Sequence, residues 1–206
     1  MCISKIDPAK GERRDPLWLF AGGAIAINLI LIGFKSCGKT VIGRELAHRL
    51  KWRFIDLDQM VEALYKEAHG QRLSSREIFQ KHGGDYFRRL EKQVLGQLER
   101  VDRCVLSTGG GTFIYNSPSV PLRNNSKIVY LRVDPDVLYR RIVSRGIPAF
   151  FQPDRPYESF HALLQERGPV YEKLADLKVD NSSVGIENVI KDILQWLATV
   201  SVNSLP

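Results

Sequence analysis

One segment has the residues and the spacing of a phosphate-binding loop: Gly33-Phe-Lys-Ser-Cys-Gly38-Lys39-Thr40 matches the pattern G-x-x-x-x-G-K-[ST]. The apolar run AINLILI at 26–32 precedes it and an amphipathic pattern at 39–50 follows it, which predicts the flanking strand and helix that such a loop requires. Backbone N–H groups and the helix N-terminus would bind phosphates, Lys39 would reach the outer phosphates, and the Thr40 hydroxyl would bind Mg²⁺. The residues predicted to bind ATP or GTP with magnesium are Gly33, Ser36, Cys37, Gly38, Lys39 and Thr40. The base-reading motif N-K-x-D of G proteins is absent, which favours a small-molecule or nucleotide kinase.

Two carboxylates, Asp56 and Asp58, lie at the end of the next predicted strand. Residues two apart in an extended chain point to the same side, so both could face the nucleotide cleft. One could then contribute to a magnesium site, and the other could accept the proton of a substrate hydroxyl. An equally weighted alternative is that Asp58 only caps the helix that follows.

Three further groups could bind an anion. Arg88 and Glu91 lie one turn apart on a predicted helix, so they could pair, and a buried arginine oriented by a glutamate would bind a carboxylate with two hydrogen bonds. The alternative is a solvent-exposed helix face. The glycines 109–111 end a predicted strand, where three consecutive glycines suggest close approach of a ligand to the backbone. Arg155 and Arg167 would add positive charge if the fold brings them to the same pocket.

The elements that must position these residues alternate between strands and helices, which predicts an α/β domain with a mainly parallel sheet. Strands are expected at 26–32, 53–55, 103–107, 128–133 and 177–179. Helices are expected at 39–50, 59–68, 85–100, 135–145, 158–175 (broken at Gly168-Pro169) and 186–200, with a capping box at Ser74-x-x-Glu77. The remaining segment, 146–157, is a long loop rich in Gly and Pro, and such loops are more often functional than accidental.

Composition agrees with a single globular domain. The chain has 206 residues, of which 44% are hydrophobic and 26% charged. The net charge of +7 is spread along the chain, which favours a small anionic ligand over nucleic acid. The three cysteines lack C-x-x-C spacing, which argues against a disulfide scaffold or zinc site and favours a reducing compartment. We therefore expect a cytoplasmic protein.

The uncharged stretch Leu17–Phe34 has the minimum length of a membrane helix, and cleavage after Ala24 or Ala26 would fit a secretory signal. Its last residues belong to the phosphate loop, and Asn28 interrupts it. We therefore interpret residues 1–26 as an N-terminal extension that leads into a buried strand, and we expect no membrane association.

With these motifs in this order, the sequence resembles shikimate kinase. Besides the phosphate loop, D-x-D and triple glycine, the shared motifs are Gly84-Asp-Tyr-Phe-Arg-Arg-Leu-Glu91, Arg155-Pro156, and Arg167-x-P-x-Y-x-x-x-A-Asp176. Their spacing matches over residues 27–198. The resemblance implies the nucleoside-monophosphate-kinase-like P-loop fold, with a five-stranded parallel sheet in the order 2-3-1-4-5, flanked by helices. It places the kinase domain at 27–206 with a lid at about 146–157. It also implies ATP-dependent phosphorylation of the 3-hydroxyl of shikimate, on the route to chorismate and aromatic amino acids.

The resemblance also implies roles for single residues. Arg88 and Arg167 would bind the shikimate carboxylate, Asp58 the ring hydroxyls, and the glycines 109–111 the substrate. Lys39, Asp58 and Arg155 would be catalytic, the last as the lid arginine on the transferred phosphate. Thr40 and Asp56 would hold Mg²⁺, and Arg145 would lie against adenine. Two features depart from the family: the lid reads Arg155-Pro-Tyr-Glu instead of R-P-L-L, and it contains Phe150-Phe151, which could seal it when closed.

Two alternatives remain: a kinase for another small hydroxy acid such as gluconate, and a nucleotide-binding regulatory homologue without turnover. Intact Lys39, Asp56, Asp58 and Arg155 argue against the second. We expect a monomer whose partner is a small molecule.

Overall fold

A five-stranded sheet forms the centre of the computed structural model, which describes residues 27–148, 150–183 and 185–202. The strands are β1 (Asn28–Ile32), β2 (Arg53–Asp56), β3 (Cys104–Ser107), β4 (Ser126–Arg132) and β5 (Leu177–Asp180). All neighbouring strands run parallel, and their order is β2-β3-β1-β4-β5, as predicted. The extension at 1–26 lies outside the described residues.

The central strand β1 is buried along its whole length because helices cover both faces of the sheet. Leu29 pairs with Val105 on one side, and Ile30 pairs with Ile128 on the other. Asn28 is the polar exception: its Nδ2 donates to the Val101 carbonyl at 2.5 Å and its Oδ1 accepts from the Cys104 N–H at 3.1 Å. This buried side chain therefore joins the start of β1 to the start of β3.

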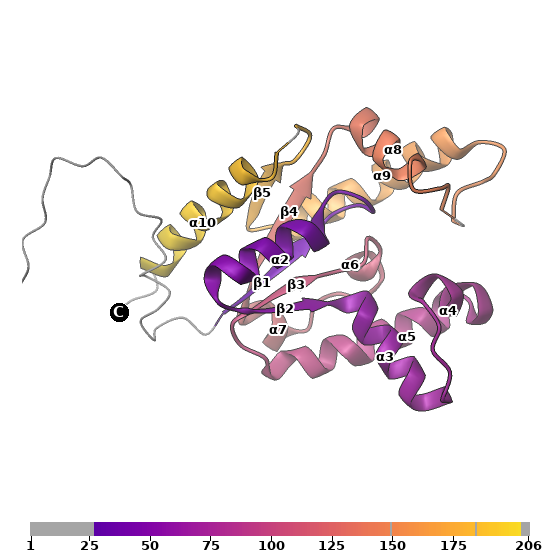
Figure 1. The fold of residues 1–206 in the computed structure, drawn as a ribbon, viewed down its shortest axis with the longest axis horizontal. Helices are drawn as coiled ribbons and strands as arrows, with labels where there is room; N and C mark the ends of the chain where they lie inside the picture. Colours follow the sequence, from indigo (N-terminus) through magenta and orange to yellow (C-terminus); the bar gives the residue numbers. More distant parts are fainter. Residues whose placement is uncertain (1–26, 149, 184, 203–206) are drawn as a thin grey trace, which may run out of the picture.

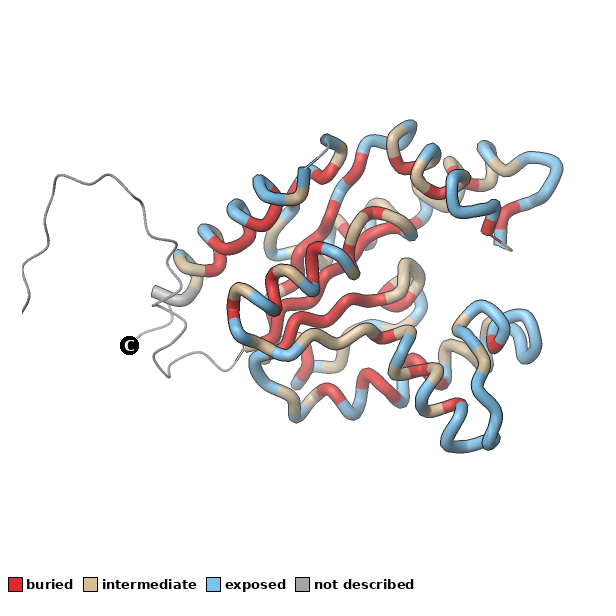
Figure 2. The backbone as a smooth tube through the Cα atoms, viewed as in Figure 1, coloured by how far each residue is buried: buried red, intermediate tan, exposed pale blue. Residues whose placement is uncertain are grey.

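The helices form three groups around the sheet (Figure 1). α2 (Lys39–Leu50) lies over β1, β2 and β3 and packs against α10 (Glu187–Val202), which contacts β5. α3 (Leu57–His69), α4 (Ser75–His82) and α5 (Gly84–Gln97) pack against one another, and the 3₁₀ turn η1 (Leu98–Arg100) follows α5. α8 (Pro135–Val143) contacts α9 (Pro156–Leu174), while the short helices α6 (Thr112–Tyr115) and α7 (Val120–Asn124) follow β3. In Figure 2 the buried residues follow the strands and the inner faces of these helices.

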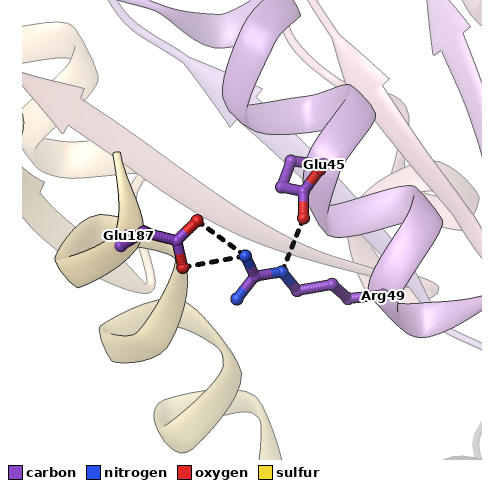
Figure 3. Close-up of polar contacts among 3 residues, drawn as sticks. All are labelled: Glu45, Arg49 and Glu187. Atoms are coloured by element: carbon purple, nitrogen blue, oxygen red, sulfur yellow. Dashed lines mark hydrogen bonds and ion pairs between the residues drawn. The ribbon is translucent and has the colours of Figure 1, made fainter. Parts of the chain in front are cut away.

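An arginine on α2 joins it to α10 at the surface (Figure 3). Arg49 donates from Nε to Glu45 at 2.7 Å and from Nη2 to both carboxylate oxygens of Glu187 at 2.8 Å. Because the three side chains are partly or largely exposed, we expect a small contribution to stability.

Three expectations about the elements were wrong or incomplete. α9 runs without a break through Gly168-Pro169, although Pro169 has no N–H to donate inside the helix. Arg167 and Tyr171, on either side of that site, are both buried, so packing against the domain offsets the lost hydrogen bond. α3 begins directly after Asp56, so Asp58 lies in its first turn rather than in an extended chain. The helices α6 and α7 were not predicted.

Candidate active site

The phosphate loop turns between β1 and α2 at two glycines with positive φ, Gly33 at 139° and Gly38 at 103°. A Cβ at Gly33 would lie 2.8 Å from the Leu131 carbonyl oxygen, so only glycine fits there. Lys39 is buried, and its Nζ donates to the carbonyls of Gly33 at 2.9 Å and Phe34 at 2.8 Å. The ammonium group therefore links the first two residues of the loop to the start of α2.

Asn181, directly after β5, holds the loop from outside. Its Nδ2 donates to the Cys37 carbonyl at 2.9 Å, and a Cβ at Gly38 would approach the same nitrogen to 2.7 Å. Sequence reasoning missed Asn181; its only signal was a polar residue at the carboxyl end of a predicted parallel strand. Cys37 itself is fully buried.

A cavity of about 670 Å³ lies beside this loop and receives side chains from all three helical groups. The predicted residues that line it are Ser36, Gly38, Lys39, Thr40, Asp56, Asp58, Arg88, Gly109, Gly110, Gly111, Arg145 and Arg167. Gly33 and Cys37 are buried and do not line the cavity, and Arg155 is exposed at the start of α9, outside it. Lining residues that sequence reasoning did not assign include Arg76, Phe79, Phe87, Ser107 and Tyr115.

Side-chain oxygens that could bind a metal ion lie close together where β2 and β3 end beside α2. Thr40 Oγ1 donates to Asp56 Oδ2 at 3.2 Å and lies 3.4 Å from Ser107 Oγ. The other oxygen of Asp56 accepts from the Asp58 N–H at 3.1 Å, so Asp56 caps α3. The alternative that Asp58 is the cap was therefore wrong, and its carboxylate is free to face the cavity.

Two cavity carboxyls have raised pKa values. Burial is the main cause at Asp58, and the neighbouring Asp56 carboxylate raises its pKa further, against the opposing charge of Lys39. Burial also raises the pKa of Glu91 to about 7, although its hydrogen bond from Thr112 acts in the opposite direction. A raised pKa suits a group that accepts a proton near neutral pH.

The expected ion pair between Arg88 and Glu91 is absent from the described residues. Glu91 instead accepts from Thr112 Oγ1 at 2.6 Å and from Asn116 Nδ2 at 3.4 Å, and the Arg88 guanidinium lies over the ring of Tyr115. Nη1 of Arg88 is buried without a hydrogen-bond partner within the described chain.

Arg167, on α9, also lines the cavity and also has an unpaired guanidinium nitrogen within the described residues. Its guanidinium carbon lies 5.5 Å from the ring centroid of Phe34 and 5.8 Å from that of Phe150, and its Nε is buried with no partner in the described part of the chain. Buried donors without acceptors are rare in folded proteins. Two of them in one cavity indicate a site for an anionic ligand.

The triple glycine is explained partly by the protein itself. A Cβ at Gly110 would lie 3.1 Å from the backbone nitrogen of Lys35, so this residue lets β3 and the phosphate loop approach each other. The Gly110 carbonyl also accepts a hydrogen bond from the Tyr171 hydroxyl.

Three described residues of the predicted lid, and Arg145 just before it, belong to the cavity wall. Arg145, Gly146, Pro148 and Phe150 line the cavity. Phe151 is only 3% exposed and packs beside Phe160 with a centroid distance of 6.3 Å. Phe150 is thus the aromatic residue of the pair that faces the ligand space.

No helix among the described residues combines the length and the apolar character needed to cross a membrane.

Comparisons with known proteins point to one family. The sequence profile of the shikimate kinase family matches residues 35–198. A shikimate kinase from Caldanaerobacter subterraneus subsp. tengcongensis is 36% identical over 82% of this chain and 94% of its own length. A structure of shikimate kinase from Acinetobacter baumannii in complex with shikimate superposes with a TM-score of 0.72 at 27% identity, covering 88% of this chain and 96% of that one. A gluconokinase from Sinorhizobium meliloti shares only the fold, with a TM-score of 0.55 at 18% identity over 88% of this chain and 97% of its own. The chain belongs to the shikimate kinase family.

Proposed function

We propose that this protein transfers the γ-phosphoryl group of ATP to the 3-hydroxyl of shikimate. One observation carries the assignment: Arg88 and Arg167 both line the cavity that the phosphate loop borders, and each has a buried guanidinium nitrogen without a partner in the described part of the chain. A carboxylate on the acceptor would satisfy both arginines by charge-assisted hydrogen bonds. The relative from A. baumannii was solved in complex with shikimate, which carries such a carboxylate.

The arginine pair would fix the acceptor so that one ring hydroxyl faces Asp58. Asp58 would accept the proton of that hydroxyl as the new oxygen–phosphorus bond forms. The bond from the γ-phosphorus to the β,γ-bridging oxygen of ATP would break, and that oxygen would leave with ADP. Lys39 would exchange its two carbonyl contacts for phosphate oxygens. Arg155 lies outside the cavity in the structure described. It would therefore reach the transferred phosphoryl group only when the lid closes.

The residues at the end of β2 fit a magnesium ion. The Thr40 hydroxyl and the Asp56 carboxylate converge at the cavity wall, and hard oxygen ligands of this kind suit Mg²⁺. When bound with ATP, Mg²⁺ would neutralise phosphate charge. Thr40 and Asp56 would hold it there.

The proposal includes the setting of the reaction. The catalytic unit is residues 27–206, and nothing in the reaction as written needs a second copy. We therefore propose a monomer in the cytoplasm, where the cysteines would remain reduced. Light scattering of the purified protein tests the monomer.

A coupled assay of ADP release with shikimate, quinate and gluconate tests the function. We expect the highest kcat/KM with shikimate and a strong loss in Lys39→Met, the control for turnover at the phosphate loop. Turnover of gluconate equal to or faster than that of shikimate would refute the assignment. ATP binding without ADP release with any acid would instead favour the regulatory alternative.

A further inference from the structure

We propose that Tyr115 is a positioning residue for Arg88 and thereby sets the affinity of the site for the acceptor carboxylate. The inference rests on the proposed function, because it assigns Arg88 to that carboxylate. Tyr115 lies at the end of α6, lines the cavity, and is 45% exposed although it is a large aromatic side chain.

The position of α6 is set by Glu91, on the helix that carries Arg88. The two oxygens of Glu91 accept from Thr112, the first residue of α6, and from Asn116, the residue after its end. Thr112 is fully buried. This double contact holds the short helix beside α5 and brings the Tyr115 ring over the Arg88 guanidinium.

Gly111 provides the space for the ring. A Cβ at Gly111 would lie 3.3 Å from Cε2 and 3.5 Å from Cδ2 of Tyr115, tighter than ordinary van der Waals contact at the first atom. The ring edge therefore lies against the Gly111 backbone while its face meets Arg88. This contact with the protein's own Tyr115 is a sufficient reason for a glycine at the third position of the motif.

The contact has a consequence for ligand binding. An aromatic face attracts a guanidinium through the ring quadrupole and accepts no hydrogen bond in the guanidinium plane. Glu91 is bound to α6, so Arg88 is held by the ring contact, and its Nη1 has no hydrogen-bond partner among the residues that the structure describes. Tyr115 thus restrains the arginine and leaves its in-plane donors available for a two-pronged carboxylate contact.

Steady-state kinetics of Tyr115→Phe and Tyr115→Leu test the proposal. Tyr115→Phe keeps the aromatic face, so its KM for shikimate should stay within twofold of the wild-type value. Tyr115→Leu removes it and should raise KM for shikimate about three- to tenfold, the range of a partly desolvated cation–π contact, with kcat and KM for ATP within twofold. In an Arg88→Gln background, Tyr115→Leu should have no further effect on kcat/KM for shikimate.

Three results would overturn the proposal. The first is a rise in KM for shikimate in Tyr115→Phe as large as in Tyr115→Leu, and the second is an unchanged KM for shikimate in Tyr115→Leu. The third is an effect of Tyr115→Leu on kcat/KM in the Arg88→Gln background that is as large as in the wild type. Thermal unfolding of each variant identifies a loss of folding, and Tyr115→Phe remains informative if Tyr115→Leu is unstable. Failure of the proposed function would be recognised in the wild-type protein, as a higher kcat/KM with another acid than with shikimate. The same comparison is then made with that acid.

Discussion

The carboxyl of Glu91 should make the stability of the ligand-free protein fall between about pH 4.5 and 7. Glu91 is 3% exposed, and burial raises its pKa from 4.5 to about 7. In this pH window the folded protein keeps a proton on Glu91 that the unfolded chain has lost. Folding is therefore favoured below the window, and this contribution is lost as the pH rises through it.

The size of the effect follows from the two pKa values. The gap between 4.5 and about 7 corresponds to about 3 kcal/mol of unfolding free energy, at roughly 1.4 kcal/mol per pKa unit. Glu91→Gln carries no titrating group there, and its amide oxygen can still accept from Thr112. Asp58, whose pKa is also raised, is present in both proteins, and its contribution largely cancels in the difference.

Urea unfolding of wild type and Glu91→Gln at pH 4.5 to 7.5, without ATP or shikimate, measures this difference. Between pH 4.5 and 7.5, the unfolding free energy of the variant should rise by about 3 kcal/mol relative to that of wild type. Any constant offset that the substitution adds does not change this difference. Glu166→Gln, the same chemical change at an exposed position of α9, is the matched control. Parallel stability curves for wild type and Glu91→Gln would refute the reasoning, and would mean that Glu91 is ionised in the folded protein.

Three further substitutions have defined outcomes. Arg88→Lys should weaken shikimate binding roughly ten- to a hundredfold and leave ATP binding unchanged, because a point charge cannot make the two-pronged contact; titration calorimetry measures both. Arg155→Ala should lower kcat roughly a hundredfold without changing shikimate affinity in the absence of ATP, because Arg155 lies outside the open cavity and would act on closure. Arg49→Met should lower the unfolding free energy by at most about 1 kcal/mol, and by less at high salt, since its ion pairs with Glu45 and Glu187 are at the surface.

Each of these expectations has a contrary result. Equal losses of shikimate and ATP binding in Arg88→Lys would make that residue structural. Normal kcat with lost shikimate binding in Arg155→Ala would make Arg155 a substrate ligand. A loss well above 1 kcal/mol in Arg49→Met would show that the link between α2 and α10 is needed for folding of the domain.

The sequence determined the features that depend on near neighbours in the chain. The phosphate loop is contiguous, so its glycines, lysine and threonine predict its geometry directly. The capping box of Ser74 and Glu77 forms as predicted, because its partners are three residues apart. The unbroken apolar run of β1 indicated a strand covered on both faces, and alternation of strands and helices indicated the parallel sheet.

Only the tertiary structure decided how distant segments meet. Glu91 is bound by α6 rather than by the arginine one turn away, and Asn181 reaches the phosphate loop across 144 positions of sequence. Pro169 lies inside a helix because its neighbours are buried against the domain. Local propensities contain no information on such contacts, since their free energy depends on which residues the fold places opposite one another. The shape of the acceptor side of the cavity, and the place of Tyr115 in it, is therefore a property of the packed chain.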